Sequence, residues 1–113
     1  GDRCVRLKMW NGDGTRVLAA YRNDCTLRLF SAEEGVSSFS SSSSSLLSSL
    51  CGCRQLISVR VVPRASKKSV WVMDDMDADE SFVACLCTTG GDRHVVVFFE
   101  RKSLECAGGV NVR

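Results

Sequence analysis

The sequence predicts an all-β fold, and three observations support that prediction. Short runs of residues alternate between apolar and polar at a period of two, which is typical of a strand with one buried face. Turn-forming residues separate these runs. No stretch shows the 3.6-residue period of an amphipathic helix. We therefore expect antiparallel strands joined by tight turns.

The first part of the chain predicts a meander of three short strands. Dense turn signals follow the first strand, at Asn11 and Gly12, and the second, at Asn23 and Asp24. In the third strand, Leu27 and Leu29 share one face and Arg28 lies on the other. The three predicted strands are residues 5–10, 16–21 and 26–30.

A serine-rich stretch interrupts the strand pattern. Ten of the fourteen residues from 37 to 50 are serine, and none is charged. Such a run has little apolar surface to bury, and its hydroxyls compete with the backbone for hydrogen bonds. We predict a disordered loop or insertion over residues 37–55.

Strand patterns resume after this stretch. Pro63, the only proline, suits the end of the first of these strands. The acidic stretch 74–80 lacks the ligand spacing of an EF-hand, so we expect a solvated turn there. The predicted strands are residues 56–62, 69–73, 82–87 and 94–99, with a further candidate at 104–107.

Length and charge narrow the class of protein. The 113 residues suffice for one domain at most, and the net charge of +2 gives no electrostatic reason for tight binding to nucleic acid or an anionic membrane. No apolar run reaches the ~20 residues of a membrane-spanning helix. The first residues are neither a start methionine nor a secretory signal, so we expect an excerpt of a longer chain.

The seven cysteines do not form a clear disulfide framework. Their number is odd and most alternate with apolar residues, which favours a reduced, intracellular chain. Cys85 and Cys87 should face the same side of a strand, as should Cys51 and Cys53 if that segment is extended. Four such thiolates could bind zinc. Zinc sites typically have the spacing C-x2-C, however, and the C-x-C spacing found here favours cysteines that pack as small buried apolar side chains. A thiol or zinc-binding β-domain stays an alternative.

No catalytic constellation is evident in the sequence. The only histidine, His94, lies in a valine-rich strand, and neither a nucleophile-elbow motif nor a phosphate-binding glycine loop is present. We therefore predict a protein that is not an enzyme, with no catalytic residue, no metal site, no cofactor and no small-molecule substrate.

One basic cluster has two interpretations. Arg60, Arg64, Lys67 and Lys68 lie close together in the sequence. They form either a solvated connection or a contact with RNA or an acidic partner, and such an RNA contact would weaken steeply with added salt.

An internal repeat is the most specific signal. Asp24 ends a turn, an alternating strand follows, and Phe30 lies six residues on; Asp92 and Phe98 repeat this layout. The two aspartates are 68 positions apart. Without a serine-rich stretch of roughly 25 residues, the period is about 43, which is typical of a four-stranded propeller blade.

Residues 13–31 resemble the WD40-repeat family from the turn after the first strand through the third strand. The resemblance implies an incomplete β-propeller of antiparallel four-stranded blades and a structural turn role for Asp24 and Asp92. Phe30 and Phe98 stand where the family has tryptophan. Neither unit has the Trp-Asp dipeptide, and Cys25 and Arg93 replace the usual glycine.

The resemblance also implies a domain division and a role. Residues 1–36 would be part of a first blade, residues 37–55 an insertion, and residues 56–113 the end of the first blade plus a second blade. The implied role is a non-enzymatic scaffold that binds other proteins of a multi-subunit complex inside the cell. The layout is also similar to WD-repeat components of a small nucleolar ribonucleoprotein, which implies a scaffold in ribosomal RNA processing in the nucleus or nucleolus, with RNA as a further partner.

Overall fold

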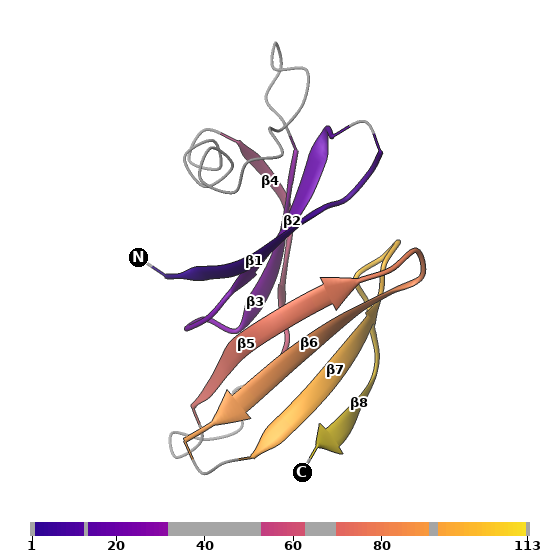
Figure 1. The fold of residues 1–113 in the computed structure, drawn as a ribbon. Helices are drawn as coiled ribbons and strands as arrows, with labels where there is room; N and C mark the ends of the chain where they lie inside the picture. Colours follow the sequence, from indigo (N-terminus) through magenta and orange to yellow (C-terminus); the bar gives the residue numbers. More distant parts are fainter. Residues whose placement is uncertain (1, 13, 32–52, 63–69, 91–92, 113) are drawn as a thin grey trace.

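The computed structural model describes residues 2–12, 14–31, 53–62, 70–90 and 93–112. Within these ranges all the regular secondary structure is β-strand. The all-β prediction is confirmed. The strands form two four-stranded antiparallel sheets, ordered β1-β2-β3-β4 and β5-β6-β7-β8 (Figure 1), which we call the first and the second sheet. The first sheet consists of β1 (Cys4–Met9), β2 (Arg16–Tyr21), β3 (Thr26–Ser31) and β4 (Arg54–Arg60). The second consists of β5 (Trp71–Ala78), β6 (Phe82–Thr89), β7 (His94–Glu100) and β8 (Cys106–Val112).

The predicted acidic turn at residues 74–80 is wrong over most of its length. β5 continues through Asp74 and Asp75 to Ala78, and the turn comes after it. A register shift between Met73 and Asp75 allows Met73 and Met76, three positions apart, both to reach the core. A prediction that requires a strict period of two therefore ends this strand at Met73, before its observed end at Ala78.

The candidate strand at residues 104–107 also needs correction. β8 begins at Cys106 and runs to Val112. Leu104 lies in the turn before it, with a positive φ of 54° and its side chain buried in the core. Burial of Leu104 gives the apolar signal that the alternation pattern assigned to a strand.

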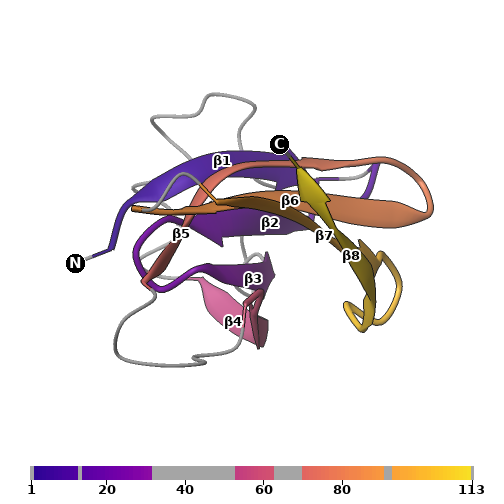
Figure 2. The ribbon, with the colours of Figure 1, turned by 90° about the horizontal axis from the view of Figure 1, so that it is seen from below.

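The two sheets meet along their first strands. β5 runs beside β1 and β2, and the sheets diverge toward β4 and β8 (Figures 1 and 2). The chain leaves the first sheet from β4, at one edge, and enters the second at β5, next to β1 at the opposite edge of the first sheet. In each sheet, the chain therefore begins at the junction and adds each further strand on the side away from it.

The main core fills the wedge between the sheets. Its fully buried side chains come from both sheets and include Leu18, Leu27, Met73 and Val83. A smaller cluster around Phe30 covers the other face of the first sheet. Burial of this apolar surface, at roughly 25 cal/mol per Å², is the main force that holds the sheets together.

The sheets share irregularities at equivalent positions. Each has one register shift where its first strand pairs with its second, with the extra residue on the first strand, and another where its third strand pairs with its fourth, with the extra residue on the fourth. The positions on the first and third strands that flank these shifts are 69 residues apart in the two sheets. The shifts lie between Cys4 and Arg6, Met73 and Asp75, Leu29 and Phe30, and Phe98 and Phe99. Bulges re-aim side chains at particular places, so their recurrence indicates two copies of one structural unit.

Candidate interaction surfaces

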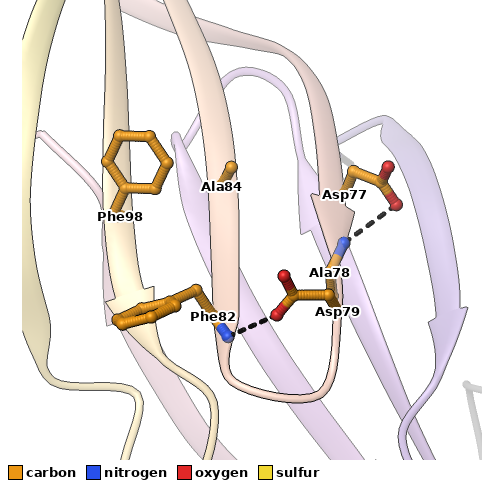
Figure 3. Close-up of a pocket in the computed structure, with 6 residues that line it drawn as sticks. All are labelled: Asp77, Ala78, Asp79, Phe82, Ala84 and Phe98. Carbon is orange, nitrogen blue, oxygen red and sulfur yellow. Dashed lines mark hydrogen bonds between the residues drawn. The ribbon is translucent and has the colours of Figure 1, made fainter.

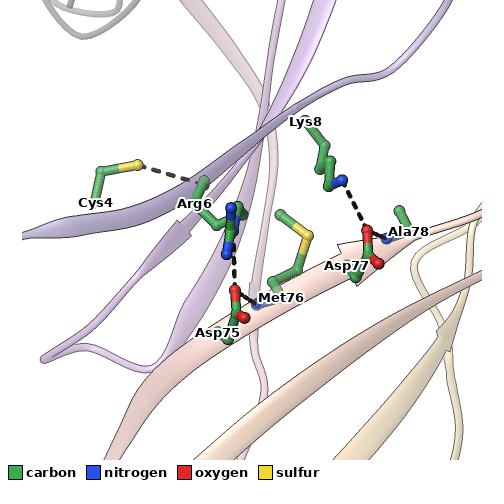
Figure 4. A network of polar contacts seen from close by, with 7 residues as sticks. All are labelled: Cys4, Arg6, Lys8, Asp75, Met76, Asp77 and Ala78. Atoms are coloured by element: carbon green, nitrogen blue, oxygen red, sulfur yellow. Dashed lines mark hydrogen bonds and ion pairs between the residues drawn. The ribbon is translucent and has the colours of Figure 1, made fainter. Parts of the chain in front are cut away.

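Ion pairs connect the two strands at the junction (Figure 4). Arg6 Nε lies 2.9 Å from Asp75 Oδ1, and Lys8 Nζ lies 2.8 Å from Asp77 Oδ1. The partners advance together along the chain, so β1 and β5 run in the same direction. In both pairs the basic group comes from β1 and the acidic group from β5, so each pair joins the two sheets.

Both carboxylates of these pairs are stabilised in the ionised form. Hydrogen bonds from the Arg6 guanidinium and from the backbone N–H of Met76 lower the pKa of Asp75. The Lys8 ammonium and the backbone N–H of Ala78 lower the pKa of Asp77 in the same way. Neither group is therefore a proton donor near neutral pH.

The turn between β2 and β3 touches the start of β5. The backbone N–H of Met73 donates to the carbonyl oxygen of Arg22 at 3.0 Å, and Arg22 Nη1 lies 2.9 Å from Asp74 Oδ1. In the core beside this contact, the sulfur atoms of Cys25 and Cys87 are 3.4 Å apart. These contacts position one end of β5 against the first sheet.

The second sheet has an apolar face that points away from the first sheet, and we call it the outer face. Cross-strand pairing aligns Ala84 with Phe98, and Leu86 with Val96 and Val110. Phe82 is 46% exposed and Val110 is 55% exposed. Phe82 and Val110 thus leave apolar surface of this face open to solvent.

A pocket of about 260 Å³ opens on the outer face (Figure 3). The rings of Phe82 and Phe98 line one side, and Asp77 and Asp79 line the other. Asp79 Oδ1 accepts hydrogen bonds from the backbone N–H groups of Phe82 and Ser81, both at 2.8 Å, which lower its pKa. The pocket thus combines aromatic surface with two ionised carboxylates.

The structure places three of the four repeat residues. Asp24 is exposed in the turn between β2 and β3, where its Oδ2 accepts a hydrogen bond from Arg28 Nη2 at 2.8 Å. Phe30 is buried on the face of the first sheet that points away from the second sheet, and half-buried Phe98 lies on the outer face of the second sheet. The register shifts pair positions 69 residues apart, so the residue of the second sheet that stands in the position of Phe30 is buried Phe99, one place after Phe98. Asp92 lies outside the described residues.

The basic cluster is placed only in part. Arg60 is exposed at the end of β4, opposite Thr26. Arg64, Lys67 and Lys68 lie outside the described residues, so an RNA contact through this cluster stays a prediction.

The structure places Cys85 and Cys87 in the core, which is the packing that their C-x-C spacing favours. Cys85 and Cys87 do face the same side of β6, and both are fully buried. Cys25, at the end of the turn between β2 and β3, lies beside Cys87. Cys53 packs against the cluster around Phe30, and Cys51 lies outside the described residues. Among the described residues, no group of three acidic, histidine or cysteine side chains is arranged to hold a metal ion.

Sequence reasoning missed Asp2, which organises the turn before β3. Its carboxylate accepts hydrogen bonds of 2.7 Å from the backbone N–H groups of Arg3, Asn23 and Asp24. Slight burial raises the pKa of Asp2, but these hydrogen bonds outweigh it and hold that pKa below its ordinary value. No spacing rule links Asp2 to a turn more than twenty positions away.

Comparisons with family models, curated proteins and solved structures find no match to this chain. In the part of the chain that the structure describes, no helix is long and apolar enough to span a membrane.

Proposed function

We propose that this chain is part of a WD40-like β-propeller that serves as a non-enzymatic binding module for other proteins of a larger assembly. The observation that carries the proposal is the structural repeat. Two sheets have the same strand order, and each has a register shift in its first–second and in its third–fourth strand pairing, flanked by first-strand and third-strand positions that are 69 residues apart.

The arrangement of the sheets supports a propeller. In such a fold, blades radiate from a shared axis, with their first strands innermost and their last strands at the rim. Here β1 and β5 run side by side in the same direction, and the sheets diverge toward β4 and β8 (Figure 2). The chain passes from β4, at the outer edge of one sheet, to β5, at the inner edge of the next, as it does between successive blades of a propeller.

The outer face supports further blades. Each blade of a propeller buries its apolar faces against its neighbours. The second sheet covers one face against the first sheet, but Phe82 and Val110 stay exposed on the other. A third sheet packed there would remove this surface from water.

The proposed scaffold role depends on turns that the sheets hold in fixed positions for a partner to bind. A packed sheet holds its connecting turns in fixed positions, and specificity then depends on their side chains. The ionised carboxylates of Asp77 and Asp79 beside two aromatic rings favour contact with a partner over proton transfer. A component of a ribosome-assembly particle is one setting in which such a scaffold would act.

The protein purified under native conditions from its own cells tests the role. We expect it to elute with other proteins in stoichiometric amount, and chemical cross-links to those proteins should involve its turns. Elution as a monomer of its own mass, with no stoichiometric partner, would contradict the scaffold. For the 113-residue chain alone, a strictly monomeric state in sedimentation experiments would contradict the need for neighbouring blades.

A further inference from the structure

The closest approach of two thiols in the described residues lies across the junction of the two sheets. Cys25 ends the turn between β2 and β3, and Cys87 lies in β6. Their sulfur atoms are 3.4 Å apart although the residues are 62 positions apart in the sequence. A disulfide bond needs about 2.05 Å, so the sulfurs must approach by only about 1.4 Å.

The two thiols differ in their readiness to ionise. The hydrogen bond between the two sulfur atoms lowers the pKa of Cys25, whereas the same hydrogen bond and burial raise the pKa of Cys87. Cys85 lies beside them, and burial raises its pKa to about 12. The thiolate is the reactive form of cysteine, so Cys25 is the nucleophile of the group.

We propose that Cys25 and Cys87 are a redox modification site, at which a peroxide joins the two sheets through a disulfide. The Cys25 sulfur attacks one oxygen of hydrogen peroxide, the O–O bond breaks, and the thiol proton leaves with the second oxygen as water. The resulting sulfenic acid is attacked by the Cys87 sulfur, which gives up its proton. The S–O bond breaks and a second water leaves, so two thiols and one peroxide give one disulfide and two waters.

The position of Cys25 supplies the access that a buried pair would otherwise lack. Cys25 is 2% exposed and Cys87 is fully buried, so a small oxidant must reach Cys25 first. Cys25 has a positive φ of 54°, a conformation that is strained for a residue with a Cβ. Its backbone hydrogen bond to the Arg22 carbonyl is long, at 3.3 Å. Local opening of this turn would expose the Cys25 sulfur.

The cross-link would fix the angle between the two sheets. It closes a loop of about sixty residues, and the loss of freedom in the unfolded chain stabilises the folded state. The inference needs only the observed contact between the sheets, so it stands apart from the propeller and scaffold proposals.

Peptide mapping of the peroxide-treated 113-residue chain tests the proposal. After oxidation and blocking of the remaining thiols, trypsin releases Cys25 in residues 23–28, and Cys85 with Cys87 in residues 69–93. We expect these two peptides to be linked, and the melting temperature to rise by about 10 °C until a reductant is added. Fragmentation between Cys85 and Cys87 identifies the linked sulfur.

Matched variants separate the alternatives. Cys85→Ser should keep the linked peptides, Cys87→Ser should lose them, and Cys106→Ser removes an exposed thiol that could join two chains. A cross-link from Cys25 to Cys85 alone, or free thiols at Cys25 and Cys87 while Cys106 is oxidised, would overturn the proposal. Mapping of the unsubstituted chain decides the question even if a variant does not fold.

Discussion

The guanidinium of Arg101 lies 4.9 Å from the centroid of the Trp10 ring, which joins the turn after β7 to the end of β1. Arg101 also donates hydrogen bonds to the carbonyl oxygens of Trp10 and Asp79. Cys25 and Cys87 lie near the start of β5, whereas this contact lies beyond its end. The two sheets are therefore connected at both ends of the junction.

Replacement of Arg101 should loosen this end. We expect Arg101→Ala to lower the free energy of unfolding by about 1–2 kcal/mol, because it removes the contact with the ring and two hydrogen bonds. Arg101→Lys should recover only part of the loss, because an ammonium group cannot present the planar fork of a guanidinium. Urea denaturation measures the change. Lys102→Ala, at the exposed neighbouring position, is the control, and equal effects of the two alanine variants would contradict the bridge.

The ion pairs between β1 and β5 should make stability depend on acid pH. The pKa of Asp75 is lower in the folded chain than its ordinary value of 3.8, chiefly because Arg6 hydrogen-bonds to it. Its contribution is therefore complete above about pH 4 and is lost as the pH falls through the lowered folded-state pKa.

Arg6→Gln should weaken that dependence. In urea titrations between roughly pH 5 and pH 2, we expect the free energy of unfolding of the variant to fall less than that of the parent chain. Arg3→Gln makes the same change of charge outside the pair and is the control. Indistinguishable acid profiles for the parent and Arg6→Gln would show that the pair makes no contribution.

The positive φ of Cys25 predicts an unusual response to glycine. At an ordinary strand position, glycine is less stable than alanine by roughly 0.5–1 kcal/mol. At Cys25, with φ of 54°, the left-handed backbone reverses the preference, so Cys25→Gly should be more stable than Cys25→Ala by about 1 kcal/mol.

Thermal or urea unfolding of both variants measures this difference. Ala20→Gly, in regular β2, should be destabilising and serves as the control. If Cys25→Ala proves the more stable of the two variants, the turn is not strained in this way.

The outer face should drive self-association of the chain. Phe82→Ser removes an exposed ring, so we expect it to reduce association in sedimentation experiments while it changes the free energy of unfolding little. Phe99→Ala, at a side chain that is 2% exposed on the opposite face of the same sheet, should cost about 3–5 kcal/mol. Unchanged association of Phe82→Ser would argue against an open binding surface.

Particular residues show how far the sequence predicts the fold. Alternation identifies β3 because Leu27 and Leu29 face the core while Arg28 does not. It fails in β5, because the bulge at Asp74 places the next buried side chain, Met76, three positions after Met73 instead of two. It also fails at Leu104, a core residue that belongs to a turn.

The sequence by itself determined the all-β class and the approximate position of most strands, because period-two burial is a local property of each segment. Only the tertiary structure decided that Arg6 meets Asp75, that Cys25 meets Cys87, and that Phe82 stays uncovered. Those relationships depend on which sheet packs against which, and at what angle. Burial of apolar surface from both sheets at once sets that arrangement, and no spacing within a single strand carries information about it.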